Sequence, residues 1–321
     1  MTSAILLFAL GLVLLIIGGD KFVDGATGIA HRFHVPELLI GATVVSIGTT
    51  LPEVMVSATS ALGGHGEIAY GNAIGSIICN TTLIAAITIA VRPAPVERTS
   101  LALPVTFFFA SALYYVYNAY AFHAFSRTAG LVLLCIFLLY MILTVLRALR
   151  TAPELQAKDD ADPGSPLWKD LLALVLGAVL IAWGANLLVD NGTLIAQSLG
   201  VPESVIALTF VALGTSLPEL VTAITSLIKG HGALSLGNIV GANLFNLVLV
   251  SGVSVTLSPF AVPTGKLFGG QPASLMVDIP VMFAVMALMT LPALIRGKLS
   301  RWQGVALLAI YAGFCTFQFF L

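Results

Sequence analysis

A succession of long apolar segments constrains this fold more than any other feature of the sequence. About ten segments of roughly 20 mostly apolar residues, the length at which one helix crosses a bilayer, follow each other along the chain. We place them near residues 3–30, 38–62, 67–91, 101–121, 127–149, 167–190, 203–228, 233–258, 273–295 and 300–320. Hydrophobic residues make up 58% and charged residues 9% of the 321 residues, which excludes a soluble globular domain. The sequence therefore predicts an all-α polytopic membrane protein with ten transmembrane helices.

The basic residues indicate how the predicted helices are oriented. With ten spans, alternate loops share a side, and the loops after the first, third, fifth, seventh and ninth spans hold all of the 14 Lys and Arg residues except Arg127 and Lys266. By the positive-inside rule these loops are cytoplasmic, so both termini are extracytoplasmic. We therefore expect a monomeric integral protein of a prokaryotic plasma (inner) membrane, with too little basic charge to bind nucleic acid.

A shift of 166 residues aligns related motifs in the two halves of the chain. Residues 41–53 (GATVVSIGTTLPE) then lie over 207–219 (ALTFVALGTSLPE) with seven of 13 positions identical, and 71–80 lie over 237–246. Each half contributes five spans, an odd number, so the second half must enter the membrane from the opposite side. The sequence thus predicts two inverted five-helix repeats, residues 1–150 and 167–321, joined by a polar cytoplasmic linker over 151–166, as in many secondary transporters.

One glutamate lies in the middle of an apolar span in each half, Glu53 and Glu219. A carboxylate at that depth costs at least ~2.5 kcal/mol on insertion scales, so it must be partnered or protonated. The sequence offers no Lys or Arg at matching depth. The partner is therefore a bound cation or a proton, and the bland alternative is a protonated glutamate that makes an interhelical hydrogen bond.

Each of these glutamates follows a proline. Pro52 cannot donate to the carbonyl of Gly48, and Pro218 cannot donate to that of Gly214, so we expect a kink with unpaired carbonyl oxygens in both helices. Such backbone is tolerated in a membrane where it lines a cavity or binds a ligand. The alternative is a packing kink whose carbonyls are satisfied by Ser or Thr.

Polar side chains recur at helical spacing around both glutamates. They are Ser46, Thr49, Thr50 and Ser57 around Glu53, Thr215 and Ser216 before Glu219, and, on the following spans, Asn72, Ser76 and Asn80 with the counterparts Asn238, Ala242 and Asn246. The glycines between these positions fit close helix packing. A ligand set made only of oxygen selects hard ions such as Na⁺, Ca²⁺, Mg²⁺ or Mn²⁺. One Ca²⁺ or two Na⁺ neutralise two ionised glutamates, and this competition is a physical basis for exchange.

At these residues the chain resembles the calcium/cation antiporter superfamily, in particular its sodium/calcium exchangers. The most specific motifs are GTTLPE at 48–53 and GTSLPE at 214–219, each followed by a Gly-Asn helix. By this resemblance Glu53, Glu219, Thr49 and Thr215 are the central ligands, surrounded by Thr50, Ser216, Ser76, Asn80 and Asn246. The resemblance also implies that the first and sixth spans slide across this core to alternate access.

The chain departs from the family pattern at three positions. Ile77 stands where the family usually has Asn, Ala242 lacks the hydroxyl that Ser76 keeps, and Asn246 replaces a frequent Asp. The last two departures leave the number of Na⁺ sites and any need for potassium open. Proton-coupled relatives place a Glu where this chain has Gly75 and Gly241, which argues against proton coupling.

The leading hypothesis is a Na⁺/Ca²⁺ antiporter that carries ions as substrates, needs no cofactor and is not an enzyme. The same fold could instead exchange H⁺ for Ca²⁺ or Na⁺ for Mg²⁺. An intramembrane hydrolase with Glu53 and Glu219 as acid and base is a third reading, which the absence of an HExxH motif in the sequence disfavours. A Ca²⁺ channel is a fourth.

Overall fold

The computed structural model describes residues 2–93, 95–156, 166–198, 214 and 216–320, and these are almost entirely helical. Eight of the described helical segments are long and apolar enough to cross a membrane, and they match eight of the ten predicted spans. The seventh predicted span is described only from Gly214 and Ser216 onward, and a helix over Arg301–Phe320 covers the tenth. The helices, with π-helical segments marked η, are α1 (Thr2–Arg32), α2 (Glu37–Ile40), η1 (Gly41–Val45), α3 (Ser46–Leu62), α4 (Gly66–Cys79), η2 (Asn80–Ala85), α5 (Ala86–Val91), α6 (Arg98–Phe122), α7 (Arg127–Gln156), α8 (Leu167–Ser198), α11 (Leu217–Ile228), α12 (Gly232–Phe245), η4 (Asn246–Val250), α13 (Ser251–Leu257), η5 (Ser274–Asp278), α14 (Ile279–Arg296) and α15 (Arg301–Phe320).

Helix α7 is longer than the membrane span Arg127–Arg150 that it contains. Helix α7 continues to Gln156, so the first six residues of the predicted linker over 151–166 are helical. Ala152, Glu154, Leu155 and Gln156 are strong helix formers, and their propensity outweighs the proline among them. Residues 157–165 of the predicted linker lie outside the described residues.

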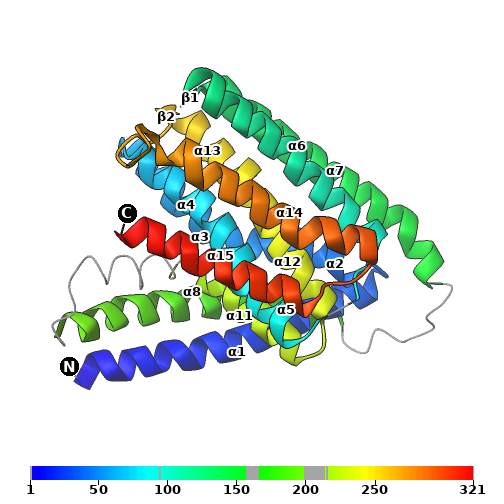
Figure 1. Ribbon diagram of the computed structural model, residues 1–321. Helices are drawn as coiled ribbons and strands as arrows, with labels where there is room; N and C mark the ends of the chain where they lie inside the picture. The colour runs from blue at the N-terminus through cyan, green and yellow to red at the C-terminus, as the bar shows by residue number, and fades with distance from the viewer. Residues whose placement is uncertain (1, 94, 157–165, 199–213, 215, 321) are drawn as a thin grey trace.

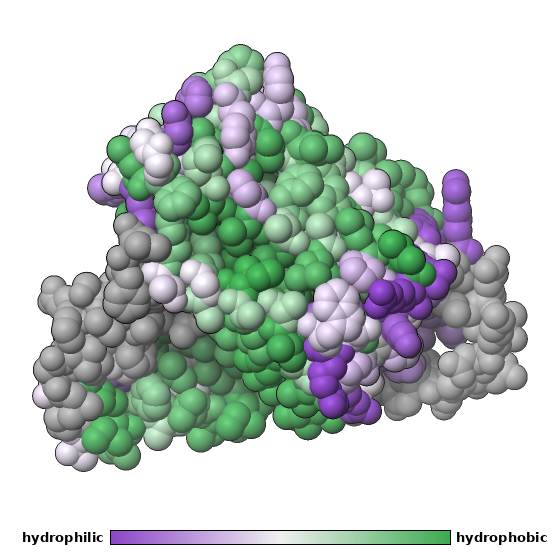
Figure 2. All heavy atoms as spheres, in the orientation of Figure 1, coloured by the Kyte–Doolittle hydropathy of each residue, from purple (hydrophilic) through white to green (hydrophobic). Residues whose placement is uncertain are grey.

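The helices form layers around a central group (Figure 1). Helices α6 and α7 lie along one edge of the molecule, α1 and α8 along the opposite edge, and both chain ends lie toward the same side of the view. A hydrophobic band crosses the middle of the visible face, and strongly hydrophilic residues gather toward its ends (Figure 2). This distribution is expected of a protein whose middle faces lipid.

The loops that follow alternate spans meet at one end of the molecule. The Arg92 guanidinium donates to the Leu227 carbonyl at 3.3 Å, and the Val96 amide donates to the Gly297 carbonyl at 2.9 Å. At the opposite end the short strands β1 (Ala124–Phe125) and β2 (Phe260–Ala261) pair antiparallel, and β3 (Leu267–Phe268) pairs with β4 (Gln271–Pro272). The loops that carry most of the basic residues therefore share one end, as the alternation of ten spans requires.

Helices α1 and α8 pack closely along a seam of glycines. A Cβ atom added to Gly11 would lie 2.9 Å from the Gly184 carbonyl oxygen, one on Gly18 would lie 2.8 Å from the Ile181 amide nitrogen, and one on Gly25 would lie 2.4 Å from that of Leu174. Since the contact positions fall on α8 as they rise on α1, the two helices run antiparallel. Small residues let helix backbones approach this closely in membranes.

A lysine from the second half of the chain connects α1 to α11. The Lys229 ammonium lies 2.6 Å from a carboxylate oxygen of both Asp20 and Asp24, whereas Lys21 reaches Asp20 only at 3.9 Å. Partial burial by itself would lower the pKa of Lys229, but its hydrogen bonds to the two aspartates raise it. Local pairing of Asp20 and Asp24 with Lys21 within α1 is therefore not the main arrangement.

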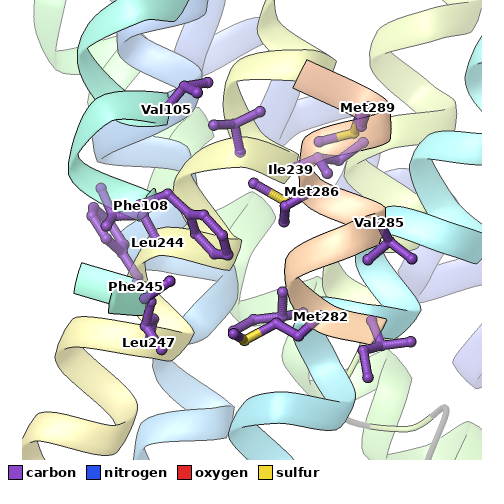
Figure 3. Packing of buried hydrophobic residues seen from close by; sticks show 14 of the residues in the cluster. Val105, Phe108, Ile239, Leu244, Phe245, Leu247, Met282, Val285, Met286 and Met289 are labelled. Atoms are coloured by element: carbon purple, nitrogen blue, oxygen red, sulfur yellow. The ribbon is translucent and has the colours of Figure 1, made fainter. Parts of the chain in front are cut away.

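The largest hydrophobic cluster fills the space between α6, α12 and α14 (Figure 3). Met282, Met286 and Met289 of α14 face Phe108 of α6 and Phe245 of α12, and all five side chains are fully buried. The Met286 sulfur also accepts a hydrogen bond from the Asn243 amide at 3.1 Å. This cluster fixes α12, which passes directly beside the predicted ion site.

Candidate ion-binding site

The same irregularity occurs in α4 and α12. Helix α4 gives way to a π-helical segment at Asn80, and α12 does so at Asn246, exactly 166 residues later. The turns that precede these helices also match, with a positive φ of 82° at Gly64 and 88° at Gly230. π-Helical turns inside α-helices are frequent at functional sites. Both predicted amide ligands therefore stand at the start of a distorted turn.

The two predicted acids are buried and lack protein partners. Glu53 on α3 and Glu219 on α11 have no exposed surface, and none of their four carboxylate oxygens has a hydrogen-bond partner among the described residues. The two acids lie near each other, and Thr49 of α3 lies beside Glu219. Two carboxylates in such surroundings cannot both stay ionised unless a cation or a proton compensates them.

The two prolines act differently in the two halves. Pro52 lies inside α3, which continues through it, so the Gly48 carbonyl loses its usual donor. Helix α11 begins at Leu217 with Ser216 as its N-cap, which puts Pro218 in the first turn. A missing amide proton costs nothing there, since first-turn amides have no partner within the helix. The second proline therefore lies in the first turn of α11, and the kink predicted there stays a prediction, since most of the segment before Ser216 lies outside the described residues.

Several of the neutral predicted ligands are also buried without hydrogen-bond partners among the described residues. In the described part of the chain the hydroxyls of Thr50 and Ser216 and both amide atoms of Asn80 are buried and unpaired. The Asn246 amide nitrogen donates to the Ala242 carbonyl at 3.0 Å, which leaves its Oδ1 buried and unpaired. Buried polar atoms without partners are rare in folded proteins, and each needs an explanation. Ligation of a cation by these oxygens is one.

The other predicted ligands within the described residues contact neighbouring helices or are simply buried. The Ser46 hydroxyl lies 2.7 Å from the Gly41 carbonyl and 2.9 Å from that of Asn238, so its single proton serves the contact between η1 and α12. Ser76 is buried on α4. A Cβ atom on Gly48 would meet Phe22 of α1, and one on Gly214 would meet Val189 of α8. Thr215 lies outside the described residues.

Two of the asparagines predicted to line the site, Asn72 and Asn238, hold other side chains in place. The Thr49 hydroxyl donates to Asn238 Oδ1 at 3.2 Å, which leaves the oxygen lone pairs of Thr49 free to face the acids. Asn72 donates to Ser57 Oγ at 2.8 Å and to the carbonyl of Glu53 at 3.2 Å. Both asparagines stand in the Gly-Asn motifs of the sequence, but only the packing shows that they hold other side chains.

Close packing of α12 against α2 and η1 brings these side chains together. A Cβ atom on Gly237 would lie 2.1 Å from the Leu38 carbonyl oxygen, and one on Gly241 would lie 2.3 Å from Ser46 Oγ. Gly71 and Gly75 have no described atom within 4 Å of such a Cβ. By the offset of 166, the segment that would pack on Gly71 and Gly75 is residues 204–211, which lie outside the described residues. The packing role predicted for Gly71 and Gly75 therefore stays a prediction.

The site suits a hard cation that takes oxygen ligands. No group of three or more His, Cys, Asp or Glu residues that could hold a metal ion occurs in the described part of the chain. A cation bound between the two glutamates would take its compensating charge from them, and hydroxyl, amide and carbonyl oxygens would have to complete its coordination shell. Such a mixed shell suits Na⁺ and Ca²⁺ and is a poor one for zinc or copper.

Comparisons with known proteins agree with this chemistry. The family model described as sodium/calcium exchanger protein matches residues 3–146 and 169–320. A putative antiporter CaxA from Alkalimonas amylolytica is 33% identical over 325 residues, covering 100% of this chain and 99% of the relative. The sodium/calcium exchanger MaX1 of Methanosarcina acetivorans is 29% identical, with the same coverage.

Solved structures of the sodium-calcium exchanger NCX_Mj share the fold. One obtained after soaking in Na⁺ and Sr²⁺ superposes with a TM-score of 0.81 at 30% identity, covering 100% of this chain and 99% of the other. The family match spans nearly all of the sequence, and the structural match extends over the paired helices that carry Glu53 and Glu219. The chain described here thus belongs to the sodium/calcium exchanger family.

Proposed function

We propose that this protein exchanges Na⁺ for Ca²⁺ across the membrane, with both ions competing for a site built on Glu53 and Glu219. The observation that carries this proposal is the pair of fully buried, unpartnered carboxylates, one from each half of the chain. One Ca²⁺ or two Na⁺ neutralise the pair. An empty site would keep two like charges in a medium of low dielectric constant, which opposes crossing between access states.

The proposed coordination shell comprises Glu53, Glu219 and the neutral oxygens around them. These are Thr49, Thr50, Ser76 and Asn80 from the first half, Thr215, Ser216 and Asn246 from the second, and the carbonyls of Gly48 and Gly214. Ser46 stays a candidate of lower rank, because its hydroxyl already bonds to backbone carbonyls. Ala242 offers no hydroxyl opposite Ser76, so the shell is less polar on the α12 side than on the α4 side.

The proposed mechanism is alternating access by two inverted repeats. The α1–α8 seam supports the inversion, because a Cβ on Gly11 meets Gly184, while one on Gly18 meets Gly177. The offset of 166 converts Gly11 to Gly177 and Gly18 to Gly184, so the two contacts exchange, as a two-fold axis between antiparallel repeats requires. The two repeats span residues 1–150 and 167–321. Helix α1 of the first repeat and helix α8 of the second then form one unit that moves against the remaining helices.

In this proposal the end that carries most basic residues is cytoplasmic, together with the linker, and both termini lie outside. The positive-inside rule and the meeting of the 92–98, 229–231 and 296–301 loops support this orientation. The protein would act as a monomer in a prokaryotic plasma membrane. Transport, not enzymatic catalysis, is the activity of the family to which it belongs.

The decisive experiment measures Ca²⁺ uptake driven by a Na⁺ gradient in proteoliposomes. Glu53→Gln keeps the shape of the side chain but removes one negative charge. With Ca²⁺ bound, the site would then carry a net charge of +1, so uptake should fall to background. Glu67→Gln, an exposed glutamate in the first turn of α4, is the matched control and should leave uptake unchanged. Unchanged uptake by Glu53→Gln would refute the assignment.

The same vesicles separate the alternatives that share this fold. If a proton gradient drives Ca²⁺ uptake and a Na⁺ gradient does not, the protein is an H⁺/Ca²⁺ antiporter. If a Na⁺ gradient drives Mg²⁺ uptake in preference to Ca²⁺ uptake, the protein is a Na⁺/Mg²⁺ antiporter. Ca²⁺ flux that is independent of any counter-ion would instead indicate a channel.

A further inference from the structure

Two hydroxyls on α11, those of Thr222 and Ser226, are buried without a hydrogen-bond partner among the described residues. Most buried Ser and Thr residues in the described helices donate to a carbonyl one turn earlier in their own helix. Examples are Thr27, Thr43, Thr81, Thr82, Thr144 and Thr290, at oxygen–oxygen distances of 2.9, 2.7, 2.7, 2.6, 2.8 and 2.6 Å. Thr222 and Ser226 have no exposed surface and no hydrogen-bond partner in the described part of the chain. An unpaired buried hydroxyl costs about 1–3 kcal/mol.

These two hydroxyls follow Glu219 on one face of α11. They stand three and seven residues after it, a spacing that puts all three side chains in a row. At a rise of 1.5 Å per residue, Ser226 lies about 10 Å beyond Glu219 along the helix axis. The helix ends two residues later, at Ile228. The row therefore leads from the central acids to the end of the helix.

The neighbouring faces of α11 are accounted for by other contacts. A Cβ atom on Gly19 of α1 would lie 2.7 Å from side-chain atoms of both Val221 and Thr225, so this face packs on α1. Ala223 is fully buried in the main hydrophobic cluster. Thr222 and Ser226 lie between these two faces, where the mobile α1–α8 unit of the proposed mechanism meets the rest of the protein.

The repeat architecture does not require these hydroxyls. The positions 166 residues earlier are Val56 and Ser60 on α3, so the first half has no equivalent row. Val56 is 39% exposed, whereas Thr222 is fully buried. The buried hydroxyl of α3 beyond Glu53 is Ser57, and it is satisfied by Asn72. The row therefore occurs on α11 of the second half, where it leads toward the end of the protein that is rich in basic residues.

Charges of both signs meet at the outer end of the row, where the Arg92 guanidinium also donates to the Leu227 carbonyl at 3.3 Å. The Lys229 ammonium lies one residue beyond the helix, but Asp20 and Asp24 hold it at 2.6 Å and compensate its charge. The carboxyl end of α11 adds the partial negative charge of a helix C-terminus. A cation that approaches or leaves along this row therefore meets no uncompensated positive charge from Lys229.

We propose that Thr222 and Ser226 are transit ligands, whose oxygens replace water around a Na⁺ or Ca²⁺ ion moving between the two glutamates and the Ile228 end of α11. This inference rests on the proposed antiport function. In the conformation described here the passage is closed, which accounts for the burial of both hydroxyls. Their unmet hydrogen-bonding capacity is used only when an ion or its water passes.

The first test is a kinetic separation with shape-conserving variants. Thr222→Val combined with Ser226→Ala should lower the maximal rate of Na⁺-driven Ca²⁺ uptake by about tenfold, the effect of losing one hydrogen-bond-sized interaction from the barrier. Equilibrium binding of ⁴⁵Ca²⁺ to the purified protein should be unchanged. Thr144→Val, which removes a buried hydroxyl bonded within α7, is the matched control and should change neither quantity. A rate equal to that of the control overturns the proposal, as does a tenfold loss of equilibrium binding, which would make both residues part of the central site.

The second test is accessibility to a positively charged, membrane-impermeant methanethiosulfonate. It uses Thr222→Cys and Ser226→Cys in a background without the three unpaired native cysteines, Cys79, Cys135 and Cys315. Both should react when the reagent is on the side of the Ile228 end, and saturating Ca²⁺ should change the rate. Ala223→Cys, one residue away and equally buried, should not react. Reaction of neither cysteine above the rate of Ala223→Cys overturns the proposal.

The outcomes also distinguish this inference from the proposed function. If Glu53→Gln abolishes Na⁺-driven uptake but both cysteines stay unreactive, the function stands and the transit row is wrong. If the wild-type protein shows no Na⁺/Ca²⁺ exchange, the proposed function fails, and cysteine reactivity still decides whether ions or water reach α11 from that end.

Discussion

The seam between α1 and α8 offers a sharp test of how this protein is held together. In Gly25→Ala the new methyl carbon would lie 2.4 Å from the Leu174 amide nitrogen and 2.6 Å from the Asp170 carbonyl oxygen. Favourable contacts of this kind are about 3.5–4.0 Å long, so the overlap is about 1 Å. Both obstacles are backbone atoms, which cannot rotate away. The two helices must therefore separate locally.

The expected size follows from two opposing effects. Overpacking of this kind costs about 1–3 kcal/mol, and the replacement of a helical glycine by alanine recovers about 1 kcal/mol. We expect Gly25→Ala to destabilise the protein by up to about 2 kcal/mol. Gly313→Ala on α15 is the matched control, since no described atom lies within 4 Å of its Cβ, and it should stabilise the protein slightly.

The assay is thermal unfolding of the purified protein in detergent, followed by circular dichroism at 222 nm and by loss of the monodisperse peak in size-exclusion chromatography. Gly25→Ala should lower the midpoint and Gly313→Ala should raise it. If both variants raise the midpoint, α1 and α8 are not in backbone contact, and the reciprocal pairing that supports the inverted repeats loses its basis.

Two further predictions concern packing and charge. Lys229→Met should cost about 1 kcal/mol at pH 8, because it removes the ammonium held by Asp20 and Asp24. The pKa of Lys229 is raised, so this stabilisation is complete below the ordinary lysine value of about 10.4 and is lost as the pH rises through the raised value. The midpoints of wild type and Lys229→Met should therefore converge at strongly alkaline pH, and a constant gap would show that the ammonium charge is not responsible. Gly237→Ala would put a methyl group 2.1 Å from the Leu38 carbonyl oxygen, so its yield of folded protein should fall well below wild type, and wild-type yield and midpoint would contradict the close approach of α12.

Much of the fold follows from local pattern. A bilayer imposes one length on every spanning helix and allows few charges within it, so hydropathy alone located eight of the spans within a few residues. Where that constraint ends, prediction was weaker. Helix α7 continues six residues beyond the span Arg127–Arg150, because helix propensity, not lipid, decides whether a chain stays helical outside the membrane.

The repeated motifs also carried much of the candidate site. A carboxylate next to a proline in the middle of an apolar span is costly, and two copies at a constant offset indicate a shared task for Glu53 and Glu219. The spacing of Glu219, Thr222 and Ser226 was present in the sequence as well. It carried no signal by itself, because most helical Ser and Thr residues bond to their own backbone.

Only the tertiary structure decided which polar atoms are left without partners. Sequence spacing puts Ser46 and Thr50 on the same face of α3, yet Ser46 bonds to backbone carbonyls and Thr50 bonds to no described residue. Likewise, Asp20 and Asp24 pair with Lys229, which is 205 residues away from Asp24 in sequence. Helical periodicity fixes the direction of a side chain relative to its own axis, whereas its partners depend on which helices meet. That choice is made by long-range packing, here by the glycine seams of α1 with α8 and of α12 with α2.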